Sequence, residues 1–135
     1  MKSMKFSSLT ISENLLRAVL DMGFEDMTPI QADSIPSLLE GKDLIGQSQT
    51  GSGKTAAFLI PILQKIQNNE SFPQAIILCP TRELCDQVLR ESRKFSKVIP
   101  GLQTVALVGG QPYSPQKQAL DSGAQLIIGT PGRTL

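Results

Sequence analysis

Hydrophobic positions recur with a helical period over the first third of the chain. Two amphipathic helices are predicted there. Ser12 caps the first helix and Gly23 ends it. The second begins at Thr28 and runs to about Glu40, and its Ile35-Pro36 step is predicted to split it.

After residue 41, short apolar runs alternate with helical patterns. The runs span 43–46, 75–79, 104–108 and 125–128. The helices are predicted from 54 to about 67, from 80 onward, and from 114 to about 123. This order of short strands and helices predicts right-handed βαβ units. The predicted fold class is therefore α/β, an open parallel sheet with helices on both faces.

Composition adds limits to this prediction. The 135 residues suit one domain, and a hydrophobic content of 40% is enough for a core. A net charge of +1 gives no global argument for nucleic acid, so such binding would need a local basic patch. The N-terminus lacks a signal-peptide pattern and no apolar run is long enough for a bilayer, so we expect a soluble, cytoplasmic protein without membrane contact.

The cysteine and histidine content narrows the possible chemistry. Cys79 and Cys85 lack a C-x-x-C spacing, and the chain has no histidine. Neither a zinc site nor a histidine-based triad is supported. Both thiols are predicted to be buried.

A glycine-rich stretch after the run at 43–46 is the strongest chemical signal. Gly51, Ser52 and Gly53 allow main-chain N–H groups to approach phosphates closely, and the following helix directs its positive end toward them. Lys54 would add an ammonium for the outer phosphates, and Thr55 a hydroxyl ligand for Mg²⁺. Ser48 stands where the general phosphate-loop pattern has glycine. A glycine-rich loop with a chance lysine is the alternative.

Gln31 has two interpretations. It lies three residues after Thr28, as in a capping box, where its side chain would accept from the Thr28 main-chain N–H. Alternatively, its amide is a paired donor and acceptor for a base edge, such as N6 and N7 of adenine.

Further polar and glycine residues follow the other strand ends, where ligands gather in open parallel sheets. They are Thr81-Arg82, Gly109-Gly110 and the segment 130–133. Any one of them alone is more often an ordinary turn or helix cap. Three such groups at one sheet edge favour a binding surface.

Five ordered motifs resemble those of the first RecA-like domain of DEAD-box ATP-dependent RNA helicases. An upstream Phe6 and the segment 23–31 resemble the Q motif, with Met27 in place of the usual proline. The segment 48–55 resembles motif I, with Ser48 in place of alanine. The segment 80–87 resembles motif Ia, with Cys85 where alanine is usual, and Gly109-Gly110 and 130–133 resemble the double glycine and motif Ib.

The resemblance implies ATP and Mg²⁺ as cofactors and RNA as partner. The implied nucleotide-binding residues are Phe6, Phe24, Gln31, Ser48, Gln49, Thr50, Gly51, Ser52, Gly53, Lys54 and Thr55. Of these, Gln31 would read adenine, Phe6 would stack on the base, and Lys54 and Thr55 would be catalytic, with Thr55 on the metal. The implied RNA-binding residues are Pro80, Thr81, Arg82, Gly109, Gly110, Thr130, Pro131, Gly132 and Arg133. The alternative for Arg82 and Arg133 is an ion pair within the fold.

The chain lacks the carboxylates that phosphoryl transfer to water requires at a strand end. In the family, the Asp-Glu-Ala-Asp motif, the Ser-Ala-Thr motif and a second RecA-like domain would lie beyond Leu135. The expected organisation is a Q-motif helical region over 1–41 and a partial RecA-like domain over 42–135. We expect this piece of a helicase not to hydrolyse ATP alone, and its open sheet edges to favour self-association. The alternative is a non-catalytic module that binds RNA or a partner.

Overall fold

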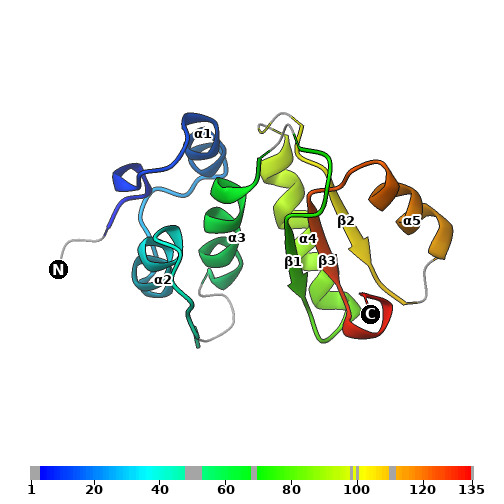
Figure 1. Cartoon of the computed structure of the whole chain (residues 1–135). Coiled ribbons are helices and arrows are strands. Elements are labelled where there is room, and N and C mark those ends of the chain that lie inside the picture. The colour runs from blue at the N-terminus through cyan, green and yellow to red at the C-terminus, as the bar shows by residue number, and fades with distance from the viewer. Residues whose placement is uncertain are drawn as a thin grey trace. The chain divides into compact units, whose positions relative to one another are not determined.

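The computed structural model describes residues 4–47, 53–67, 70–97, 99, 101–109 and 112–134. The chain divides into two compact units, Met1–Lys65 and Ile66–Leu135. Most helices and strands of the two units are labelled in Figure 1.

The first unit is helical. It contains a 3₁₀ turn η1 (Phe6–Ser8) and the helices α1 (Glu13–Asp21), α2 (Pro29–Leu39) and α3 (Lys54–Lys65). Helix α3 packs against both α2 and α1. The apolar pattern all round α3 is explained by this packing, since Leu59 and Ile60 are fully buried.

Helix α1 begins as predicted, because the Ser12 hydroxyl accepts a hydrogen bond of 3.2 Å from the Leu15 N–H. After the helix, Gly23 has a φ of 88°, a conformation that favours glycine. Leu15, Leu16, Val19 and Leu20 are spaced to form one apolar face of this helix. Leu15 and Val19 are buried, whereas Leu20 is exposed.

Helix α2 runs through Pro36 without a break, so the predicted split at Ile35-Pro36 is wrong. Proline removes one main-chain N–H from the helix, yet the next turn still forms, with Glu40 N donating to Pro36 O at 3.2 Å. Ile35 is fully buried, and α2 packs along α3. This packing outweighs the local cost of the proline.

The predicted strand over 43–46 does not form. Residues 42–47 have no regular secondary structure, and Ile45 is fully exposed. A strand exists only where a neighbouring strand pairs with its main chain. None of the described strands pairs with the segment 43–46, which accounts for the difference.

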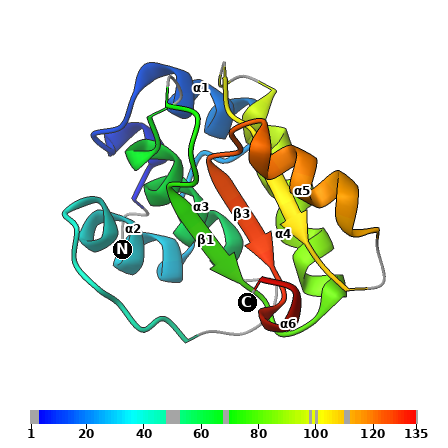
Figure 2. The same cartoon turned by 45° about the vertical axis from the view of Figure 1, so that its right-hand side comes forward.

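The second unit is built on three parallel strands, β1 (Ala75–Leu78), β2 (Thr104–Leu107) and β3 (Leu126–Gly129). Their order is β1-β3-β2, so β3 is central. Figure 2 shows the sheet with its connecting helices. All four residues of β3 are buried, as expected for the middle of a parallel sheet.

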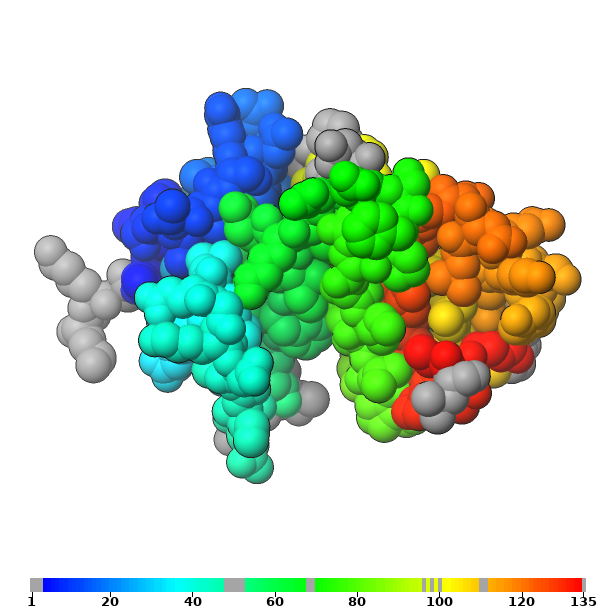
Figure 3. Space-filling view, in the orientation of Figure 1, coloured from blue at the N-terminus to red at the C-terminus, as the bar shows by residue number. Residues whose placement is uncertain are grey.

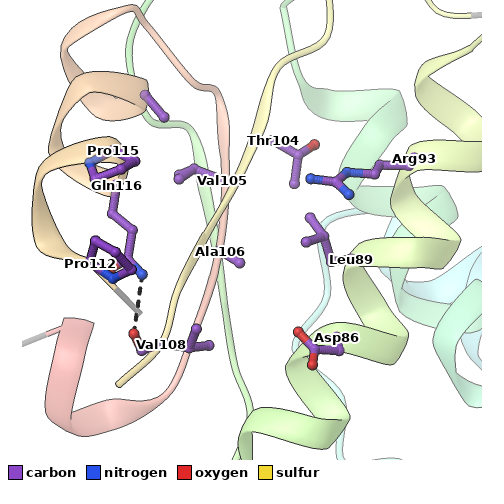
Figure 4. Close-up of a pocket in the computed structure, with 11 residues that line it drawn as sticks. Asp86, Leu89, Arg93, Thr104, Val105, Ala106, Val108, Pro112, Pro115 and Gln116 are labelled. Atoms are coloured by element: carbon purple, nitrogen blue, oxygen red, sulfur yellow. Dashed lines mark hydrogen bonds between the residues drawn. The ribbon is translucent and has the colours of Figure 1, made fainter. Parts of the chain in front are cut away.

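Two helices cover opposite faces of this sheet. Helix α4 (Arg82–Ser96) lies on one side of β2 and α5 (Tyr113–Asp121) on the other, as Figure 4 shows. The core on the α5 side contains residues of β2, of β3 and of the loop before β3: Val105, Leu107, Ala124 and Ile127. Ala119 and Leu120 of α5 pack against them. A short helix α6 (Pro131–Thr134) follows β3. The predicted fold class, an open parallel α/β sheet with helices on both faces, is confirmed.

One face of β1 is not covered. Ile76 is 56% exposed and Leu78 is 59% exposed, although the apolar run predicted a strand buried on both faces. The segment around β1, light green in Figure 3, lies at the surface. Strand β1 therefore leaves an edge and two large apolar side chains accessible.

No helix in the described part of the chain is long and apolar enough to cross a membrane.

Candidate functional site

Gln31 is a buried polar residue of the first unit and makes two side-chain hydrogen bonds. Its side chain is 1% exposed. The Oε1 atom accepts a hydrogen bond of 2.9 Å from the Thr28 N–H, and the Nε2 atom donates one of 3.1 Å to the carbonyl oxygen of Gly53. Gln31 thus joins the start of α2 to the residue before α3.

The predicted capping arrangement of Thr28 and Gln31 is present. The Thr28 hydroxyl, however, is buried and makes no hydrogen bond to any described residue. Each of these two bonds uses one site of the Gln31 amide, so one N–H and one oxygen lone pair of the amide remain for a ligand. Helix capping and base recognition are therefore compatible in their hydrogen-bond count, and the adenine role stays a prediction.

Gly53 needs to be glycine for two reasons. Its φ is 89°, and a Cβ atom built there would overlap Nε2 of Gln31 and lie 3.3 Å from the Thr28 hydroxyl oxygen. The Gln31 contact and the backbone turn therefore depend on the same missing side chain. Sequence reasoning assigned Gly53 to the phosphate loop but did not foresee its contact with Gln31.

Lys54 and Thr55 are the first two residues of α3 and are half-buried. A positive-φ glycine, a lysine and a hydroxyl at a helix start form a donor set that fits a polyphosphate with Mg²⁺. The other predicted loop residues, Ser48, Gln49, Thr50, Gly51 and Ser52, lie outside the described residues.

The predicted aromatic residues lie together in the first unit. Phe6 is fully buried, and its ring centroid lies 5.7 Å from that of Phe24, with a tilt of 45° between the rings. The Phe6 N–H also donates to Glu25 O at 2.9 Å. Phe6 is therefore a core residue in this structure, and Phe24 is half-buried beside it. The predicted stacking of Phe6 on a base is untested.

In the second unit, the predicted RNA-binding residues follow the carboxyl ends of the three strands β1, β2 and β3. Pro80 and Arg82 are exposed, and the Thr81 hydroxyl caps α4 by accepting from the Leu84 N–H at 3.2 Å. The helix-cap alternative for Thr81 is confirmed. Arg82 is the first residue of α4.

The glycines of this edge differ in their surroundings. A Cβ atom at Gly109 or Gly132 would meet nothing within 4 Å, so both leave their main chain open to a ligand. At Gly129, in contrast, a Cβ atom would overlap the Thr134 hydroxyl and lie 3.0 Å from Leu107 O. Gly110 lies outside the described residues.

Thr130 ties the ends of β2 and β3 together. Its N–H donates to Leu107 O at 3.0 Å, and its own carbonyl accepts from the Thr134 N–H at 3.1 Å, across α6. Pro131 and Gly132 are exposed within this turn. The segment 130–133 is thereby fixed beside the strand that precedes Gly109.

Arg133 contacts helix α5. Its Nη1 donates to Gln116 Oε1 at 3.1 Å, and its guanidinium carbon lies 5.8 Å from the centroid of the Tyr113 ring. A hydrogen-bond acceptor and an aromatic ring of α5 therefore both contact the guanidinium. Neither Tyr113 nor Gln116 was predicted from the sequence, since nothing in the local pattern links α5 to residue 133.

A cleft of about 390 Å³ follows the outer edge of β2, between α4 and α5. Figure 4 shows Leu89 and Arg93 entering it from α4, and Gln116 from α5. Leu107 O accepts from the Thr130 N–H on the β3 side, so the alternation of a parallel strand turns the main chain of Ala106 toward the cleft.

The two cysteines are buried free thiols, as predicted. Burial, the neighbouring Cys79 and the charge of Asp86 raise the pKa of Cys85 to about 11. Cys85 is therefore a protonated thiol near neutral pH.

The open parallel α/β sheet and the glycine turn before α3 define the class of phosphate-loop proteins. Comparison with known proteins gives the family. The family model described as DEAD/DEAH box helicase matches residues 28–135, and the chain belongs to this family.

The chain is similar to bacterial proteins named as RNA helicases. The chain is 49% identical over 130 residues to "ATP-dependent RNA helicase DeaD" of Haemophilus influenzae, covering 96% of this chain and 21% of that protein. It is 48% identical over 130 residues to the protein of the same name from Escherichia coli, covering 96% of this chain and 21% of that protein. The chain therefore spans about a fifth of these relatives.

A solved structure has the same fold. The crystal structure of a DEAD box protein from the hyperthermophile Methanococcus jannaschii superimposes with a TM-score of 0.91 and 40% sequence identity, covering 100% of this chain and 37% of that one. The chain therefore has the same fold as a little over a third of that structure.

Proposed function

We propose that the chain is the ATP- and RNA-binding portion of a DEAD-box RNA helicase. The adenine nucleotide would be held by Phe6, Phe24, Gln31 and the loop 48–55, and Mg²⁺ by Thr55. The helical region 1–41 would supply base recognition and residues 42–135 the phosphate and RNA contacts. Unwinding of RNA driven by ATP would belong to the whole parent protein.

The hydrogen bond between Gln31 Nε2 and Gly53 O carries the nucleotide proposal. A base-reading amide is useful only when it is fixed relative to the phosphates of the same nucleotide. Here the amide is bonded to the residue at which the predicted phosphate loop enters α3. Buried and bonded on two sides, Gln31 has a defined orientation before any ligand binds.

The RNA proposal rests on residues after the strands of the second unit. Arg82 is exposed at the start of α4, Gly109 and Gly132 leave their main chain open, and Arg133 is held beside α5 by Gln116. Guanidinium groups, exposed amides and a hydroxyl are groups that contact phosphate and sugar. Such contacts position a strand and do not read its sequence.

We infer that the 135-residue chain alone does not hydrolyse ATP. Hydrolysis needs carboxylates that hold the metal and orient water. The described strands β1, β2 and β3 are followed by Cys79, Val108 and Thr130, none of which is acidic. A non-catalytic module that binds RNA or a partner is therefore the second candidate for the isolated chain, and phosphate release from ATP on addition of RNA would exclude it.

Binding of a fluorescent ATP analogue to the purified chain tests the nucleotide proposal. Lys54→Ala removes the ammonium proposed for the phosphates, and we expect affinity to fall about tenfold. Lys65→Ala, an exposed lysine at the other end of α3, is the matched control and should bind as the unmodified chain does. Equal affinities for all three proteins would contradict the proposed site.

A further inference from the structure

Helix α5 contains two glutamines. Gln116 is buried, whereas Gln118 is exposed. Its Nε2 donates a hydrogen bond of 3.1 Å to Val108 O, which Figure 4 shows as a dashed line. Its Oε1 accepts one of 3.1 Å from Nη1 of Arg133. Both ends of the amide are therefore satisfied by parts of the chain far apart in sequence.

The two partners fix the orientation of this amide. A guanidinium can only donate, so it must face Oε1, and a main-chain carbonyl can only accept, so it must face Nε2. A primary amide is the neutral side chain that offers both functions at once. Val108 directly precedes Gly109, so Gln116 connects that open glycine to Arg133.

Helix α5 contacts Arg133 at two points. Tyr113 and Gln116 are three residues apart and so lie on one side of the helix. The Tyr113 ring meets the guanidinium carbon at 5.8 Å, while the Gln116 amide bonds its Nη1. A long, flexible arginine side chain is thereby ordered before it meets a ligand, which lowers the entropic cost of binding.

We propose that Gln116 is a positioning residue for RNA binding, which holds the Arg133 guanidinium and the main chain entering Gly109 in register along one stretch of phosphate backbone. This inference rests on the proposed function of Arg133 and Gly109. Gln116 itself, buried on α5, would not touch the RNA.

Binding of a single-stranded RNA oligomer by the 135-residue chain gives the first test. Gln116→Met keeps the side-chain length but removes both hydrogen bonds, and we expect binding to weaken about tenfold. The slope of log K against log salt should fall by about 0.7, as it should for Arg133→Gln, because one phosphate contact is lost in each. Gln118→Met is the matched control and should change neither quantity.

The double variant separates positioning from general support of the fold. If Gln116 acts through Arg133, Gln116→Met combined with Arg133→Gln should bind RNA no more weakly than Arg133→Gln alone. Losses that multiply in the double variant, or full-strength binding by Gln116→Met, would overturn the proposal. Circular dichroism of each variant identifies any that does not fold.

Side-chain NMR provides a reading that needs no RNA. The order parameter of the Arg133 Nε–Hε group should drop in Gln116→Met and stay unchanged in Gln118→Met. Gln116→Glu should restore it, because a carboxylate still accepts from the guanidinium. An Arg133 side chain equally ordered in Gln116→Met would overturn the inference, whereas an unmodified chain that binds no RNA would overturn the proposed function, so the two failures are distinguishable.

Discussion

The side-chain Nε2 of Gln31 lies 3.1 Å from the carbonyl oxygen of Gly53 and donates a hydrogen bond to it. The two residues are separated by 22 positions in the sequence, yet each depends on the other. Gly53 leaves the space that the amide occupies, and the amide satisfies the carbonyl at the turn into α3. In the proposed function, this contact makes base recognition and phosphate binding parts of one rigid site.

Replacement of Gly53 tests that dependence. Gly53→Ala places a Cβ atom at a φ of 89° and against Gln31 Nε2, so we expect the free energy of unfolding to fall by about 1 to 3 kcal/mol. Affinity for the ATP analogue should fall as well, because Gln31 must move. Gly109→Ala is the matched control, since its Cβ would meet nothing within 4 Å. Urea unfolding and titration measure both effects, and a stable Gly53→Ala variant with normal affinity would contradict the contact.

Gly129 gives a parallel prediction for the second unit. Gly129→Ala brings a Cβ atom against the Thr134 hydroxyl and Leu107 O, and should lower the free energy of unfolding by about 1 to 3 kcal/mol. Gly132→Ala, with open space around it, should have a much smaller effect. Urea denaturation of the two variants is the measurement. If Gly129→Ala and Gly132→Ala had equal free energies of unfolding, the predicted close contact at Gly129 would be contradicted.

The thiol of Cys85 predicts a pH dependence of stability. Its pKa is raised from 9.0 to about 11 in the folded chain, mainly by burial. Between these pH values the unfolded chain loses this proton while the folded chain keeps it, so the free energy of unfolding falls as pH rises. Cys85→Ala should flatten this fall. The measurement is urea unfolding at pH 8 and pH 10, and an identical pH dependence in the variant would contradict the raised pKa.

The open edge of β1 predicts self-association of the isolated chain. Ile76 and Leu78 are large, apolar and more than half exposed on an edge strand. Light scattering should show oligomers, and Ile76→Lys combined with Leu78→Lys should shift them toward monomer. A monodisperse unmodified monomer would contradict this expectation.

Local patterns were enough to predict helices α1 to α5 and the three strands that form, but not the short elements η1 and α6. Ser12, Thr28 and Thr81 stand at helix starts where capping residues are expected, and the apolar runs at β1, β2 and β3 are typical of a parallel sheet. The motifs that follow these elements identified the family. Their order along the chain, rather than any single residue, made that prediction possible.

The failures concern interactions that a local pattern does not contain. The run at 43–46 has the composition of a strand, but pairing partners decide whether a strand forms. Pro36 predicts a helix break, but packing of α2 on α3 decides otherwise. The local pattern did not indicate a role for Gln116, because its partner Arg133 is 17 residues away in the sequence and β3 lies between them along the chain.

Discrimination between ATP and GTP by the 135-residue chain tests the central claim most directly. Isothermal titration with each nucleotide should show ATP binding at least about tenfold more tightly. The Gln31 amide can donate to N7 of either purine, but its oxygen accepts from N6 of adenine and would face the O6 acceptor of guanine. In Gln31→Leu this preference should vanish. Equal affinities for ATP and GTP in the unmodified chain would contradict the assignment of Gln31 as the base-reading residue.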